Sequence, residues 1–174
     1  MNRKLGLATT ILVALTLSAC TPKKKPPVEK VEKPVSTDTF VDSSTQTLFG
    51  TGLTAEELAT YGINGDPLQY TVLYFQYNSS AIDQRSRIIA TRHAQHLASN
   101  GGGRVTLEGH ADERGTRDFN LALGERRAQT VSQLMSSEGA NSSIQTISYG
   151  EERPVDAAHN EAAWTSNRRV EIKY

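Results

Sequence analysis

The sequence predicts an α+β fold, a two-layer sandwich with helices packed on one face of a mixed β-sheet. Short stretches rich in β-branched and aromatic residues alternate with amphipathic stretches long enough for helices. The last segment, 168–174, alternates apolar and charged residues, as a strand with one solvated face does. No internal repeat is present, and 174 residues with 37% hydrophobic content allow one ordinary core.

Residues 1–19 have the layout of a bacterial lipoprotein signal peptide. A basic start precedes an uncharged apolar run that is too short to span a membrane, and Leu17-Ser-Ala-Cys20 follows it. This pattern resembles the lipobox, in which cleavage leaves an acylated cysteine as the first residue. We expect lipidation at Cys20, the single cysteine. Thr21, where an Asp would favour the inner membrane, predicts attachment to the outer membrane.

Residues 20–66 are predicted to form the lipidated cysteine and a flexible tether. Lysines at 23–25, several prolines and a Ser/Thr-rich stretch bury too little apolar area to fold. Roughly 30 such residues reach about 30 Å on average. A short helix is expected to begin at Thr54, with a capping box to Glu57. Residues 67–174 are predicted to form the globular domain.

The elements of this domain follow from turn signals and periodicity. Tyr70–Tyr77 is apolar on both faces, which favours a buried central strand. We expect a helix capped by Ser80 with Asp83 to run to about Ser99. The remaining predictions are a strand at 104–108, a helix at 117–137, a strand at 144–149, a short helix after residue 160 and the strand 168–174.

The helix predicted at 117–137 places a cation beside the core. Its inward stripe is predicted to contain Leu121, Gly124, Ala128, Val131 and Met135. Arg127 and Asn120 lie together at the margin of this stripe, where a guanidinium is costly without a partner. Asp112 is a candidate partner, because it follows a strand and precedes a helix, the position where α/β sheets tend to build ligand sites.

Two interpretations of Asp112 and Arg127 stay open at this point. The two side chains form a structural ion pair, or together they bind a ligand that carries both charges. A carboxylate beside a guanidinium suits an ammonium and a carboxylate on one carbon, the free end of an amino acid. In a cell envelope, diaminopimelate in the peptidoglycan stem peptide offers such an end.

Other classes of function have weaker support. A wall hydrolase would use Glu108, Asp112 or Glu113 as an acid/base pair, but no defined geometry supports it. A metal site from His110 with Asp112 and Glu113, or from the histidines at 93 and 96, matches no known ligand spacing. We expect no enzyme activity, cofactor or metal. The 19 basic and 19 acidic side chains give no global field for nucleic acid.

The domain resembles the peptidoglycan-associated lipoproteins of the Tol-Pal system, within the wall-binding domains of the outer-membrane-protein-A (OmpA) type. The resemblance covers about 70–174 and implies a βαβαβ order. Several ordered motifs carry it: Leu73-Tyr-Phe75, Glu108-Gly-His-Ala-Asp-Glu-Arg-Gly-Thr116, Asn120, Leu123-Gly-Glu-Arg-Arg-Ala128, Ser148-Tyr-Gly150, Glu161-Ala-Ala-Trp164 and Asn167-Arg-Arg-Val170.

The resemblance implies the residues of a diaminopimelate site. In the family, the Asp of the Gly-His-x-Asp stretch and an Arg fifteen residues later hold diaminopimelate, and these match Asp112 and Arg127. By the same match, the site is lined by Thr116, Asn120, Leu123, Tyr77 and Asn78. The family usually has acidic residues where this chain has Gln76 and Asn78. Asn78 still forms hydrogen bonds but lacks the charge that attracts an ammonium.

The resemblance also implies a function and partners. The protein would be a non-enzymatic outer-membrane lipoprotein whose domain faces the periplasm and binds peptidoglycan, supporting envelope integrity and cell division. Its partners would be the TolB-like periplasmic propeller and other Tol proteins. The alternative is a wall-binding lipoprotein of OmpA type outside the Tol-Pal system. A flagellar stator anchor shares the domain but needs a transmembrane helix, which the lipobox excludes.

Overall fold

A mixed four-stranded sheet forms one layer of the domain. The computed structural model describes residues 48–140 and 143–174, so the predictions for the signal peptide, Cys20 and most of the tether lie outside the described residues. The strands are β1 (Val72–Tyr74), β2 (Arg104–His110), β3 (Ser143–Gly150) and β4 (Arg169–Lys173), in the order β1-β4-β2-β3. β2 and β3 are parallel, whereas β4 runs antiparallel to both of its neighbours.

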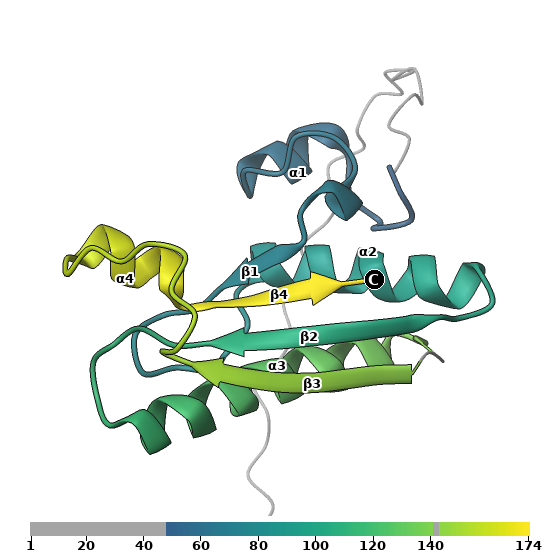
Figure 1. Ribbon diagram of the computed structural model, residues 1–174. Helices are drawn as coiled ribbons and strands as arrows, with labels where there is room; N and C mark the ends of the chain where they lie inside the picture. The colour runs from purple at the N-terminus through teal and green to yellow at the C-terminus, as the bar shows by residue number, and fades with distance from the viewer. Residues whose placement is uncertain (1–47, 141–142) are drawn as a thin grey trace, which may run out of the picture. The chain divides into compact units, whose positions relative to one another are not determined.

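Two long helices, α2 (Gln84–Ser99) and α3 (Arg117–Ser137), form the second layer on one face of the sheet (Figure 1). One hydrophobic core lies between the layers, and alternate residues of the strands and one face of each helix contribute to it. Shorter elements are α1 (Ala55–Thr60), a 3₁₀ turn η1 (Pro67–Gln69) and α4 (Glu161–Asn167). The predicted α+β two-layer fold is therefore confirmed. No helix within the described residues is both long and apolar enough to cross a membrane.

The helices begin at side-chain caps that the sequence contains. Thr116 accepts a hydrogen bond from the backbone N–H of Phe119 and so begins α3. Thr54 and Glu57 form the expected capping box at α1. The predicted start of α2 at Ser80 is wrong by one turn, because Asp83 is the cap and accepts from the backbone N–H of Ser86 at 2.7 Å.

The first strand occupies a position in the sheet other than the one expected, and the last strand is less solvated than predicted. β1 is an edge strand of three residues, not the predicted central strand at 70–77, and Tyr74 on its outer face is exposed. The two interior strands are β4 and β2, and Val170 and Ile172 of β4 point into the core as predicted. Its other face is only partly solvated, because Arg169 is buried.

The buried face of α3 is rotated from the predicted stripe. Leu121, predicted to point inward, is 40% exposed, whereas Asn120 and Leu123 are buried. The physical reason is the close approach of α3 to β2 at two glycines. A Cβ on Gly109 would lie 2.0 Å from the carbonyl oxygen of Gly124, so the backbones touch here and the helix face centres on Gly124.

Residues 48–66, which we placed in the tether, pack against the core. The side chains of Leu58 and Ile63 are buried in the same hydrophobic cluster as the strands. Asp66 pairs with Arg92 of α2 at 3.2 Å, and Gln95 donates to the carbonyl of Gly50. The structured region thus extends N-terminal to residue 67, because five apolar side chains of this polar segment lie in the core or against it.

Candidate functional site

Arg127 is the largest fully buried side chain among the described residues, with 0% of its surface exposed. Its position on α3 points the guanidinium between the loop that follows β1 and the end of β2. Three backbone carbonyls accept its hydrogen bonds: those of Ser79 at 2.8 Å, His110 at 2.7 Å and Gln76 at 3.1 Å. The helical periodicity predicted Arg127 at the margin of the core, whereas the structure places it fully inside.

The burial of Arg127 disfavours the charged form of its guanidinium. Burial lowers the pKa of this guanidinium to about 10, although the nearby carboxylate of Asp112 acts in the opposite direction. The ring of Phe75 lies 5.3 Å from the guanidinium carbon and provides a weak cation–π contact. Three of the five N–H groups of Arg127 meet carbonyls, and no carboxylate within the described residues forms an ion pair with it.

Asp112 lies just beyond the end of β2, in the loop before α3, and only 4% of its surface is exposed. Two arginines other than Arg127 bind its carboxylate. Arg114 contributes its Nη2 at 2.8 Å and Arg168 its Nη1 at 3.2 Å. Burial acts to raise the pKa of Asp112, but the hydrogen bonds from Arg114 and Arg168 outweigh it, so the pKa lies below its usual value.

The structural ion pair between Asp112 and Arg127, one of the two interpretations left open, is therefore not what this structure contains. The two groups are close enough to influence each other's charge, yet each has other partners. Their nearness follows from the fold, because the backbone of His110, two residues before Asp112, holds the guanidinium.

Sequence reasoning missed the role of Arg168. This side chain is buried, and it donates to the Phe75 carbonyl at 3.0 Å as well as to Asp112. A signal was available, because Arg168 shares the strand parity of Val170 and Ile172, both of which point into the core. An arginine on the apolar face of a strand requires a buried anion or carbonyl, and Asp112 supplies it.

The other predicted site residues fall into two groups. Asn120 is buried one turn into α3 and donates to the carboxylate of Glu151. Leu123 is also buried, one turn before Arg127, whereas Thr116 is exposed at the start of the helix. All three belong to the N-terminal half of α3, so the helix brings them to the side on which Arg127 points.

Tyr77 and Asn78 lie in the loop that follows β1, across the site from α3. Asn78 has a positive φ of 49°, a conformation that asparagine tolerates better than most residues. Tyr77 is 57% exposed, and its ring stacks on the guanidinium of Arg114 with 4.1 Å between the guanidinium carbon and the ring centroid. The loop that carries these residues is the one whose carbonyls hold Arg127.

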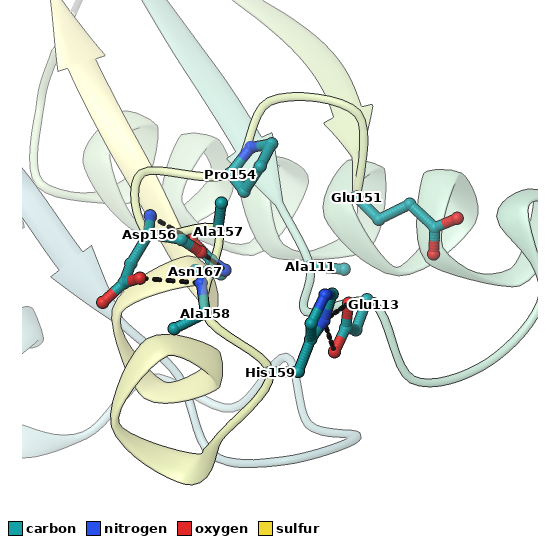
Figure 2. A pocket seen from close by; sticks show the side chains of 9 residues that line it. All are labelled: Ala111, Glu113, Glu151, Pro154, Asp156, Ala157, Ala158, His159 and Asn167. Atoms are coloured by element: carbon teal, nitrogen blue, oxygen red, sulfur yellow. Dashed lines mark hydrogen bonds and ion pairs between the residues drawn. The ribbon is translucent and has the colours of Figure 1, made fainter.

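Beside this cluster lies a small pocket of about 150 Å³, between the loop at 111–113 and the segment 151–159 (Figure 2). Small apolar side chains make much of its wall: Ala111, Pro154, Ala157 and Ala158. Its rim carries Glu113, which pairs with His159 at 2.7 Å. The side chain of Glu151 is directed toward α3, where it meets Asn120.

The competing sites have no matching geometry among the described residues. Within the ranges 48–140 and 143–174, no group of three His, Cys, Asp or Glu side chains is arranged to hold a metal ion. Both ring nitrogens of His93 are engaged, by the Tyr174 hydroxyl at 2.6 Å and the Tyr70 carbonyl at 2.9 Å. The pKa of Glu113 is lowered by hydrogen bonds from His159 and Trp164, which disfavours its use as a general acid.

The family model for the OmpA family matches residues 74–168, which contain β2, β3 and both long helices, together with the site described above. The chain belongs to the OmpA family. Within this OmpA-family domain, the matched range runs from β1 to the buried Arg168.

Similar proteins confirm the resemblance to the peptidoglycan-associated lipoproteins. The protein of that name from Pseudomonas aeruginosa is 46% identical over 104 residues, which are 59% of this chain and 61% of the relative. The one from Haemophilus influenzae is 35% identical over 69% of this chain and 79% of the relative. The match thus spans about three fifths of the length of the Pseudomonas relative.

Solved structures agree with this OmpA-family fold. The crystal structure of the peptidoglycan-associated lipoprotein from Burkholderia pseudomallei has a TM-score of 0.61 at 35% identity, covering 63% of this chain and 94% of that chain. The C-terminal domain of Helicobacter pylori MotB has a TM-score of 0.54 at 22% identity, covering 60% of this chain and 83% of that one. The second likeness concerns the fold alone.

Proposed function

We propose that this protein is an outer-membrane lipoprotein that binds peptidoglycan without covalent chemistry, through the diaminopimelate of the stem peptide. One observation carries the proposal: Arg127 is a fully buried cation that meets carbonyls but no carboxylate within the described residues. A buried charge without an opposite charge is costly, and a ligand carboxylate would offset that cost. The names of the similar proteins, peptidoglycan-associated lipoproteins, support peptidoglycan as the polymer that is bound.

The binding mechanism is a clamp with two charges. Arg127 takes the free carboxylate of diaminopimelate with its remaining N–H groups, and Asp112 takes the ammonium on the same carbon. Asn78, across the site, adds a neutral acceptor where relatives are expected to have an acid. Asp112 and Glu113 both have pKa values below their usual range, so they stay ionised and suit binding rather than proton transfer.

A role in the cell envelope follows from the proposed binding of peptidoglycan. A lipid at Cys20 in the outer membrane and a domain on the wall would connect the two layers and support envelope integrity and cell division. In the Tol-Pal system, the TolB-like propeller and other Tol proteins would be its partners. The alternative is a wall-binding lipoprotein outside that system. Copurification of a Tol propeller with the full-length chain supports the first and its absence the second.

Calorimetric titration of the full-length chain in detergent with stem peptides tests the clamp. One peptide ends in diaminopimelate, and the other carries lysine, which lacks the second carboxylate. We expect only the first to bind. Asp112→Asn should weaken binding by about 2 to 5 kcal/mol, because it leaves the ammonium of the ligand without an opposite charge. Arg127→Lys should also weaken binding, because lysine keeps the charge but lacks the planar fork that binds a carboxylate with two N–H groups. Arg126→Lys is the matched control, since Arg126 is the exposed neighbour of Arg127.

Two results would contradict the proposal. Equal binding of both peptides would mean that the second carboxylate of diaminopimelate does not contribute to binding. Unchanged affinity in a folded Arg127→Lys variant would make the arginine a structural group that only holds three carbonyls in place.

A further inference from the structure

Arg114 holds the carboxylate of Asp112 with three donors. Its backbone N–H donates to Oδ1 at 3.1 Å, its Nε to Oδ1 at 3.3 Å and its Nη2 to Oδ2 at 2.8 Å. With Arg168 donating to Oδ2 at 3.2 Å, both oxygens of the carboxylate are occupied. A carboxylate accepts about four hydrogen bonds, so this one has no free place for an ammonium.

The two arginines on Asp112 differ in how firmly they are held. Arg168 is buried, and it also donates to the Phe75 carbonyl and to the Thr165 hydroxyl. The Arg114 side chain is 28% exposed, and its remaining ion pair is with Glu161, which is 64% exposed. Surface ion pairs of this kind contribute little free energy. Arg114 is therefore the arginine that a ligand can displace from Asp112.

Two aromatic rings hold the guanidinium of Arg114 in this position. Its carbon lies 4.1 Å from the centroid of Tyr77 and 4.3 Å from that of Trp164. Tyr77 comes from the loop after β1 and Trp164 from α4, so three separate segments meet at this one cation. Such a sandwich positions a cation, since each ring face attracts positive charge.

We propose that Arg114 is an internal stand-in for the ligand: in the free protein its guanidinium occupies the place on Asp112 that the ammonium of an amino-acid end takes on binding. This inference rests on the proposed function and adds a competing group to the same site. A ligand must displace Arg114 from Asp112, so the arginine lowers the affinity. It also raises selectivity, because a cation without a carboxylate for Arg127 gains too little to displace it.

The test compares Arg114→Gln with Arg117→Gln, the matched control. Arg117 carries the same charge three residues along the chain and pairs with Glu152, away from Asp112. The full-length chain is titrated with meso-diaminopimelate, and the emission of Trp164, the single tryptophan, is followed. We expect Arg114→Gln to bind about fivefold tighter than the parent, the gain expected from removing a modest ion pair. Arg117→Gln should bind like the parent.

The emission gives a second readout of the same event. In the parent, diaminopimelate should shift the Trp164 emission as the guanidinium leaves the ring, and in Arg114→Gln this shift should be absent. Arg114→Lys, which keeps the charge but loses the bidentate grip, should bind with intermediate affinity. Parent binding with equal or weaker binding by Arg114→Gln would overturn the inference alone. Failure of all variants to bind would overturn the proposed function itself.

Discussion

His110 is a buried ionisable residue whose surroundings disfavour its charged form. Its ring is 2% exposed and lies against Tyr149, and neither ring nitrogen has a hydrogen-bond partner among the described residues. Burial lowers the pKa of His110 to about 4, and Arg169, Arg153 and Lys173 act in the same direction, while Glu171 opposes them. His110 is therefore neutral in the folded protein at physiological pH.

This gives the folded protein a specific sensitivity to acid. The unfolded histidine takes up a proton near its ordinary pKa of 6.5, but the folded one does so only near 4, so the unfolded state binds more protons between these values. Stability should fall by about 3 kcal/mol as the pH drops through this window. Urea unfolding across the window should show a smaller loss in His110→Gln, whereas His96→Gln should behave like the parent. An unchanged slope in His110→Gln would exclude this residue as the cause.

Sequence reasoning predicted that Asp112 and Arg127 lie near each other, but it did not predict their hydrogen-bond partners. The helical wheel placed Arg127 near the core, and the position of Asp112 after a strand placed it at the same edge of the sheet. Neither argument shows how deep a side chain lies or which of several arginines binds a carboxylate. Here Arg114 and Arg168 lie nearer to Asp112 than Arg127 does, because long flexible side chains from two other segments converge on it.

At the scale of elements, alternation predicted the strands better than their places in the sheet. Apolar residues on both faces indicated a central strand at 70–77, yet Tyr74 on its outer face is exposed and β1 forms an edge. β4, which the alternation predicted to have one solvated face, is an interior strand, and the charged residues on its outer face pair with one another. Glu171 pairs there with both Arg169 and Lys173. The alternation of apolar and charged residues along a strand does not show which charged side chains pair with one another.

The contact of α3 with β2 depends on two glycines. A Cβ on Gly109 would meet the backbone oxygen of Gly124 at 2.0 Å, and backbone cannot move away as a side chain can. We expect Gly109→Ala to lower the unfolding free energy by at least about 2 kcal/mol. Gly103→Ala is the control, since its Cβ would meet only Leu97 at 3.9 Å. Thermal unfolding followed by circular dichroism measures both, and similar melting temperatures would contradict the contact.

At the scale of the whole domain, the segment 48–66 is an integral part of the core. Composition suggested a tether up to residue 66, because polar residues outnumber apolar ones there. Composition averages over a segment and so conceals single anchoring residues. Leu58 is almost fully buried, and α1, which carries it, has the capping box that the sequence predicted.

We expect Leu58→Ala to destabilise the domain by about 2 to 4 kcal/mol, as truncation of a buried leucine does. Leu121→Ala is the matched control, because Leu121 is exposed and should change stability by less than about 0.5 kcal/mol. Denaturant unfolding of both variants measures the difference. If Leu58→Ala proved as stable as the control, the segment 48–66 would have to be regarded as part of the tether.

The order of strands in the sheet has a consequence for biosynthesis. β4, which comes after the other three strands of this sheet in the sequence, lies between β1 and β2, and its backbone joins them across the middle of the sheet. A nascent chain that has not yet released β4 from the ribosome has an unpaired β1, a separate β2–β3 pair and an open core. The domain therefore cannot complete its sheet until β4 has left the ribosome, and the pairing joins residues far apart in sequence, which makes folding slow.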